Sequence, residues 1–190
     1  MAQGKKYIKR GHFKMFNCHE NPTMPPPRGA APVAFLDEIS DEESYAISFL
    51  RHWSSDEKSK TKVIAELVKH LGKHRAHDAE QCLETLHFFL TTHPITPIMY
   101  HDLTCDCVGA HEACFANFIT LAANAKKKDA LIFASLLVNP RFLEVFHQSG
   151  EKFGLAIKLI SQSEKVSKLT IRVKQREHVD ESTSETIFRE

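Results

Sequence analysis

From Ser40 onward, apolar residues recur at intervals of three and four, and no other feature of the chain constrains its fold as strongly. The clearest example begins after Ser54 and Ser55 and consists of Val63, Ile64, Leu67, Val68 and Leu71. Residues at this spacing share one face of an α-helix, and an apolar face of this width is normally buried against other helices. The sequence therefore predicts an all-α fold from residue 40 to about residue 160.

Capping residues, glycines and prolines divide this region into about eight predicted helices. Ser40 and Glu43 have the spacing of a capping box at the start of the first helix. Gly72 is expected to end a helix and Gly150 to separate two, since glycine is common just beyond a helix C-terminus. Short connections favour antiparallel packing of neighbours in one compact domain. The predicted segments are 40–53, 54–72, 78–93, 96–105, 110–125, 129–138, one that Asn139 and Pro140 open, and one that ends near 160.

The composition of the two ends differs from that of the helical region, so three parts are predicted. They are a basic, proline-rich extended arm at 1–37, a helical domain at 38–162, and a strand with a polar tail at 163–190. Within the last part, Leu169, Ile171 and Val173 alternate with polar residues, which is the period of a β-strand. A single strand needs a partner for its backbone groups. We expect that partner to be a sheet edge on another protein chain or residues 12–16.

Cysteine and histidine residues are concentrated between residues 101 and 114. On the predicted short helix, His101 and Cys105 would share a face. The next predicted helix would bring His111 and Cys114 toward Cys107. Thiolates and imidazoles in a tetrahedral set suit zinc. The sequence thus predicts a zinc site, although buried apolar cysteines or redox-active thiols would account for the same residues. The candidate ligands are Cys105, Cys107, His111, Cys114 and, as a substitute, His101.

The N-terminal arm interleaves basic and aromatic residues, which fits two kinds of partner. Phosphate contact and base stacking would indicate nucleic acid, and the residues for that interpretation are Lys5, Lys6, Lys9 and Arg10. The aromatic residues Tyr7, Phe13 and Phe16 would instead contact another protein chain. For the predicted C-terminal strand, the partner-binding residues are Leu169, Ile171 and Val173.

Net charge, hydropathy and cysteine content indicate where in the cell the protein is expected. The formal net charge is +1, which gives no overall attraction to nucleic acid or membrane. The start of the chain has no apolar core of a secretory signal, and the most apolar stretch, at 130–138, is too short to insert into a membrane. Five cysteines in irregular spacing favour a reducing compartment, so we expect the cytoplasm.

Catalytic motifs are sparse. With seven glycines, the chain shows no glycine-rich phosphate loop and no nucleophile elbow. His70, His74 and His77 form a second group of histidines, which we interpret as a solvated helix end. A non-enzymatic adaptor or assembly subunit of a protein complex is the favoured function. A nucleic-acid-associated regulator and a metal- or thiol-dependent enzyme or sensor are the alternatives.

Overall fold

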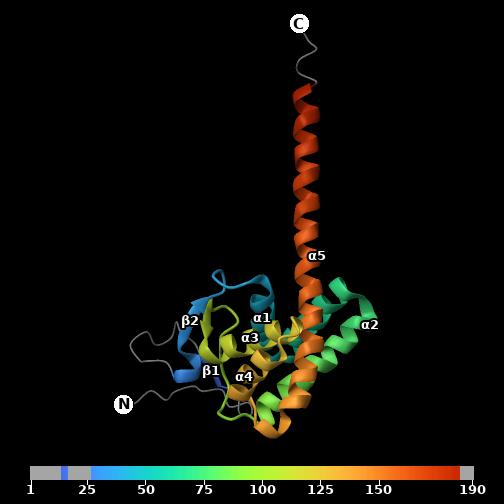
Figure 1. The fold of residues 1–190 in the computed structure, drawn as a ribbon. Helices are drawn as coiled ribbons and strands as arrows, with labels where there is room; N and C mark the ends of the chain where they lie inside the picture. Colours follow the sequence, from blue (N-terminus) through green and yellow to red (C-terminus); the bar gives the residue numbers. More distant parts are fainter. Residues whose placement is uncertain (1–13, 17–26, 185–190) are drawn as a thin grey trace, which may run out of the picture.

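A computed structural model describes residues 14–16 and 27–184, and it describes their side chains from 27 to 165 (Figure 1). These residues form five α-helices, four short strands and two short 3-10 helices. Their order is β1 (Lys14–Phe16), η1 (Arg28–Ala30), β2 (Pro32–Phe35), α1 (Asp41–Ser55), α2 (Glu57–Thr92), β3 (Met99–His101), β4 (Cys107–Gly109), α3 (Ala110–Ala123), α4 (Lys127–Leu137), η2 (Pro140–Phe142) and α5 (Leu143–Ser184).

The prediction of an all-α domain with about eight helices and a C-terminal strand is wrong. The described residues contain five α-helices and two two-stranded sheets, although the fold is mainly helical. The helix count falls because one pair of predicted helices is joined across a kink at Gly72 as α2, and another pair forms the continuous helix α5. It falls further because the segment predicted as a short helix at 96–105 contains strand β3 instead.

Helix α1 begins where its capping residues predict. The Glu43 backbone N–H donates to Ser40 Oγ at 3.3 Å, and the Ser40 N–H donates to the Glu43 carboxylate at 3.0 Å, so the capping box is confirmed. This reciprocal pair satisfies backbone donors that the helix itself leaves without acceptors. The helix then buries one face in the core through Ala46, Ile47, Phe49, Leu50 and Trp53.

Helix α2 joins two predicted helices across Gly72. This residue has φ 75° and ψ 163°, outside helical geometry, within a helix of 36 residues. A positive φ is accessible to glycine and strained for residues with a Cβ atom. Gly72 therefore breaks the regular helix as expected, but the helical conformation resumes at once rather than at Asp78, so the two halves form one bent element.

Helix α5 passes straight through Gly150, which was expected to separate two helices. The reason is a tertiary contact with α3. A Cβ atom on Gly150 would lie 2.2 Å from Cζ of Phe118, which is far inside van der Waals contact. The Phe118 ring also stacks on Phe146 of α5 with a centroid separation of 4.7 Å. Glycine at this position lets α5 approach α3 closely and does not end the helix.

The predicted C-terminal strand is wrong as well, because residues 167–174 lie within the 42-residue helix α5. A strand at this position would need a paired neighbour, whereas a helix satisfies its backbone groups internally. The geometry of a helix also separates the three predicted partner-binding residues. Leu169 and Val173, four residues apart, share a face, and Ile171 does not share it.

Two small sheets lie on one side of the helical body (Figure 1). Strand β1 pairs in parallel with β3, with Phe16 opposite His101, and β2 pairs antiparallel with β4, with Phe35 opposite Cys107. Both pairs join the N-terminal segment to residues 99–109. Residues 14–16 thus pair with β3. They do not pair with the segment at 167–174, for which residues 12–16 were one of the two predicted partners.

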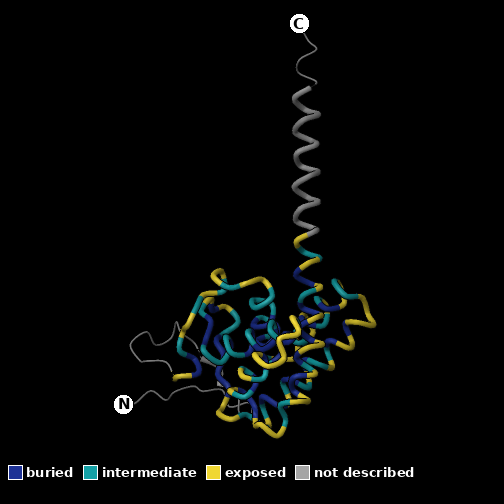
Figure 2. The backbone as a smooth tube through the Cα atoms, viewed as in Figure 1, coloured by how far each residue is buried: buried dark blue, intermediate teal, exposed yellow. Residues whose placement is uncertain are grey.

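The hydrophobic core lies among α1, α2, α3 and α5, with α4 packed against α3 and α5 (Figure 2). Its largest fully buried side chains include Phe115 and Phe118 of α3 and Phe146 and Phe153 of α5. Helix α3 contacts α1, α4 and α5, and its first turn adjoins both sheets. The residues that start α3 are thereby held between the helical core and the strands.

Among the described residues, no helix combines the length and the apolar character that a membrane crossing requires.

The packing around Gly150 can be tested by replacing it with alanine. We expect Gly150→Ala to lower the free energy of unfolding by about 1–3 kcal/mol, because the new methyl group overlaps the Phe118 ring. Urea denaturation would measure the change. In a Phe118→Leu background the same glycine substitution should cost less, since the smaller side chain makes room for the methyl group. A Gly150→Ala protein as stable as the wild type would contradict this packing.

Candidate metal centre

The candidate site is built on the connection between β3 and β4. Strand β3 ends at His101, a turn follows in which the Cys105 N–H donates to the Asp102 carbonyl at 3.1 Å, and β4 begins at Cys107. The Asp102 carboxylate stabilises this turn by accepting bonds from the N–H and the hydroxyl of Thr104, at 3.1 and 2.9 Å. The turn therefore returns the chain so that Cys105 lies beside His101.

A buried ion pair anchors this connection to the helices. Arg51 of α1 donates from Nε to Glu112 Oε1 at 2.6 Å and from Nη2 to Oε2 at 2.9 Å, which is a bidentate contact. The Arg51 side chain is 2 % exposed and that of Glu112 is 0 % exposed. Two charges removed from water are costly unless every polar atom around them finds a partner. The surrounding backbone supplies those partners.

Both charged groups also bind the backbone of the site. The Arg51 guanidinium donates to the carbonyls of Cys105 and Cys107, each at 2.6 Å, so it holds the turn that carries both thiols. The Glu112 carboxylate accepts the N–H of His101 at 3.0 Å and that of Gly109 at 2.8 Å. The bond from Gly109 is also the cap of α3. One ion pair thus fixes α1, α3, β3 and β4 relative to one another.

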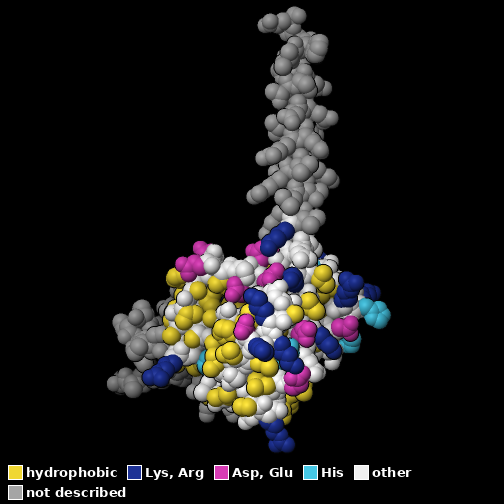
Figure 3. Space-filling model, in the orientation of Figure 1, with side chains coloured by type: hydrophobic (Ala, Val, Ile, Leu, Met, Phe, Trp, Pro, Cys, Tyr) yellow, Lys and Arg dark blue, Asp and Glu magenta, His cyan; other side chains and the backbone are white. Residues whose placement is uncertain are grey.

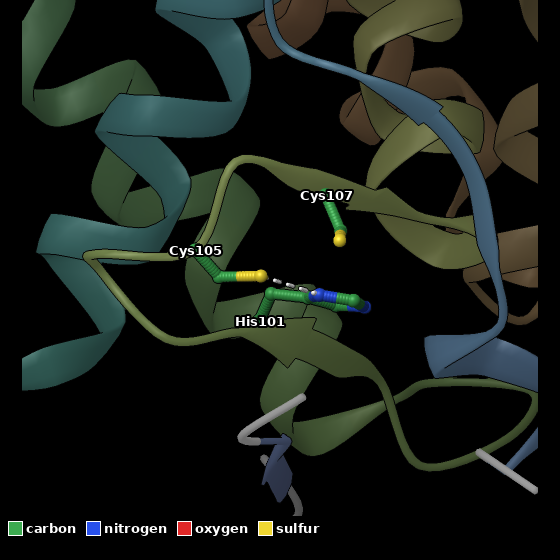
Figure 4. A group of neighbouring side chains, drawn as sticks. All are labelled: His101, Cys105 and Cys107. Carbon is green, nitrogen blue, oxygen red and sulfur yellow. Dashed lines mark hydrogen bonds between the residues drawn. The ribbon is translucent and has the colours of Figure 1, made fainter. Parts of the chain in front are cut away.

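Three of the five candidate ligands converge within this frame: His101, Cys105 and Cys107 (Figure 4). One ligand atom from each lies within 4.8 Å of the other two. His101 and Cys105 are buried, and Cys107 is partly buried. Three donor atoms at this separation could bind one ion, because metal–nitrogen and metal–sulfur bonds to zinc are about 2.0–2.3 Å long.

The hydrogen bonds of His101 fix which ring nitrogen faces the thiols. Its Nε2 lies 2.9 Å from the Ala30 carbonyl, which can only accept, so Nε2 carries a proton. In the neutral imidazole, Nδ1 then presents its lone pair to Cys105 Sγ at 3.3 Å. Tetrahedral zinc would hold such nitrogen and sulfur atoms about 3.6 Å apart. A backbone carbonyl that orients the second ring nitrogen is a usual feature of metal-binding histidines.

The other two candidate ligands lie elsewhere. His111 Nδ1 accepts the Met99 backbone N–H at 3.0 Å, so its lone pair is already used. Burial lowers the pKa of His111 and favours the neutral ring. Cys114 lies on α3, partly buried against the hydrophobic core, and burial raises the pKa of its thiol. The structure therefore brings His101, Cys105 and Cys107 together without His111 or Cys114.

The residues predicted to bind partners have a different distribution. Phe16 ends β1, and Leu169, Ile171 and Val173 lie in α5. The remaining candidates of the N-terminal arm fall outside the described residues: Lys5, Lys6, Tyr7, Lys9, Arg10 and Phe13.

Sequence reasoning missed the two residues that hold the site, Arg51 and Glu112. Each left a signal. Arg51 follows Ile47 and Leu50 on the apolar face of the first helix, where a charged residue needs a buried partner. Glu112 is the third residue of α3, the position at which a carboxylate returns to cap the backbone.

Comparison with known proteins gives no relative: no protein-family model, no curated protein and no solved structure matches this chain.

The ion pair can be tested by substituting Arg51 with methionine, which keeps much of the side-chain volume. Glu112 would be left buried without its counter-ion, and we expect the free energy of unfolding to fall by about 3–5 kcal/mol. Lys127 and Glu144 form a matched exposed pair, 51 % and 60 % exposed. Lys127→Met should cost less than about 1 kcal/mol. Equal losses in the two variants, measured by urea denaturation, would mean that Arg51 does not hold the site together.

Proposed function

We propose that this chain is a non-enzymatic adaptor, or assembly subunit, of a larger protein complex, in which a zinc-tied helical body presents α5 to another protein chain. The observation that carries this proposal is the course of α5. It packs in the body over its first turns and then continues outward as a single helix to Ser184 (Figure 1).

The length of α5 supports a role in binding. Its 42 residues correspond to about 63 Å at 1.5 Å per residue. Helices in water owe most of their stability to packing of an apolar face against other parts of a protein. A helix that leaves its own domain gains that packing from a partner, and an amphipathic helix laid against a groove or another helix is a common mode of recognition.

The apolar residues of α5 support the same interpretation. Leu155 and Leu159, on the part of α5 that packs in the body, are 46 % and 44 % exposed. In the sequence, Val166, Leu169 and Val173 continue the spacing of three and four along the helix. This is the spacing of helices that pair with other helices. The partner surface that fits it is a helix or groove with its own apolar stripe.

Zinc is proposed at His101, Cys105 and Cys107 because two thiols and an imidazole are the ligands that zinc prefers. The bond from the Ala30 carbonyl already fixes the required orientation of His101. Structural zinc is closed by four protein ligands, so the fourth would come from a residue outside the described part of the chain. Free thiols persist in reducing compartments, which supports a cytoplasmic location as part of the proposal.

The mixed surface of the body supports a protein partner. A cavity of about 550 Å³ lies between α2 and α5, lined by residues that include Leu71, Cys82 and Leu155. Another, of about 640 Å³, is lined by residues that include Phe35 and Asp106, beside the candidate ligands. On the face of the body seen in Figure 3, both signs of charge are interspersed with apolar side chains. A mixed face of this kind suits protein contact better than binding to a polyanion.

The zinc proposal predicts about one metal ion per chain in protein purified without chelators. Cys107→Ser should release the ion and lower the melting temperature, because metal binding is coupled to folding. Cys114→Ser is the matched control and should keep the bound ion and the wild-type melting temperature. Cys18→Ser is measured beside them, since this fifth cysteine lies outside the described residues. Metal-free protein with an unchanged melting temperature would exclude structural zinc.

The adaptor proposal predicts that truncation after Lys165 leaves the melting temperature of the body nearly unchanged and removes partner binding. Thr170→Pro should have the same effect, because proline breaks a helix interior at a cost of about 3 kcal/mol, and Thr170→Ala is the control. Self-association would be measured by analytical ultracentrifugation and partner capture by quantitative mass spectrometry. A truncated chain that unfolds, or that binds as well as the full chain, would refute the docking role of α5.

A further inference from the structure

An open groove runs between α2 and α5, which pack side by side in the helical body (Figure 1). It is the cavity of about 550 Å³ described above, and Leu71, Ala79, Cys82 and Ala156 contribute to its lining. Ala79 of α2 and Ala156 of α5 are both buried. Because neither alanine has a side chain beyond Cβ, the space above them is left unfilled by this chain.

A ridge of two leucines borders the groove. Leu155 and Leu159 of α5 line the same cavity and are 46 % and 44 % exposed. They are four residues apart, so their side chains are neighbours on the helix surface. An apolar ridge beside an unfilled apolar groove is the shape that helices use when they pack against one another. The surface therefore offers both halves of a helix contact.

Three charged side chains line the groove as well: Arg75 and Asp78 of α2 and Lys152 of α5. All three are exposed, and none forms an ion pair or a side-chain hydrogen bond with another residue of the range 27–165. Burial raises the pKa of the Cys82 thiol, and the charges of Lys152 and Asp78 act on it in opposite directions, so both lie close to the groove. Two cations and one carboxylate are thus available to an occupant.

We propose that this groove is the contact between two copies of the chain, in which α2 and α5 of both copies pack around a two-fold axis. A two-fold contact brings one surface against itself, so that surface must carry both halves of every interaction. The groove meets this condition. Leu155 and Leu159 enter the groove of the second copy, and Asp78 faces Arg75 and Lys152 of the second copy.

The overall charge is compatible with this contact. The formal net charge of +1 gives little repulsion between two copies. Both signs of charge lie beside the same apolar groove, so each copy supplies the counter-charges of the other. A purely acidic partner would leave Asp78 facing a like charge, and a purely basic one would do so for Arg75 and Lys152.

The inference goes beyond the adaptor function and is separable from it. Every residue of the groove precedes Lys165. The inference assigns Leu155 and Leu159 to a second copy and leaves the part of α5 beyond Lys165 to the adaptor's partner. In the chain truncated after Lys165, self-association therefore reports on the groove, and the loss of partner capture reports on α5.

The first test is sedimentation velocity of the reduced full chain from micromolar to submillimolar concentration, where we expect a monomer–dimer equilibrium. Leu155→Glu and Leu159→Glu should each weaken dimerisation roughly tenfold or more, because each new carboxylate is buried twice in a two-fold contact. Ile132 and Leu136 of α4 are a matched pair with the same spacing, 61 % and 54 % exposed. Ile132→Glu and Leu136→Glu should leave the dimerisation constant unchanged.

The second test exchanges the charges. Asp78→Lys leaves only cations in the groove, and Arg75→Glu/Lys152→Glu leaves only anions, so each variant alone should fail to self-associate. An equimolar mixture of the two should form a heterodimer, because the cations of one groove then face the anions of the other. Both variants should keep the wild-type melting temperature, since the three side chains are exposed.

Three results would each overturn the inference. The first is a wild-type chain that stays monomeric at submillimolar concentration. The second is an equal loss of dimerisation in the α5 and α4 variants, which would indicate non-specific apolar association. The third is the absence of a heterodimer in the mixture of folded charge variants. Failure of the adaptor proposal would appear separately, as partner capture that survives truncation after Lys165.

Discussion

The buried contact between Arg51 and Glu112 is the interaction on which the arrangement around the candidate metal centre depends. Burial of two charges is favourable only where hydrogen bonds replace the lost water. Here the guanidinium reaches the carbonyls of Cys105 and Cys107, and the carboxylate receives the N–H groups of His101 and Gly109. The pair therefore organises the backbone of the site as much as it joins α1 to α3.

Two histidines of the described residues are oriented by a contact from another part of the chain. His101 lies 2.9 Å from the Ala30 carbonyl, and His70 of α2 lies 2.8 Å from Ser163 of α5. In His101, the opposite ring nitrogen faces the Cys105 thiol, and zinc is the metal that suits such donors. In His70, the opposite ring nitrogen contacts Glu66 one turn away, so this histidine belongs to the contact between α2 and α5.

The sequence predicts those parts of the fold that are determined locally. The start of α1 follows from Ser40 and Glu43, which contact each other within one turn. The role of Gly150 follows from Phe118, far away in the chain, and the strand at 99–101 follows from its pairing with β1. Neither partner can be identified from local periodicity. The alternation of Leu169, Ile171 and Val173 is too short to outweigh the continuation of a helix.

The candidate site likewise has features that follow from the local sequence and features that depend on distant contacts. The cysteines and histidines within fourteen residues include three side chains that the fold brings together, but a predicted helix could not show that a turn brings Cys105 back to His101. Nor could the predicted helix show that the Met99 backbone N–H donates a hydrogen bond to His111 Nδ1. The strand pairing has a further consequence during synthesis on the ribosome. Residue 14 emerges 85 residues before its partner Met99, which is roughly 4–17 s at about 5–20 residues per second. Until Glu112 also emerges, the guanidinium on α1 has no counter-ion and stays in water. Helix α1 can therefore form and contact α2 early in translation, but its Arg51 contact with α3 forms only after residue 112 has been made.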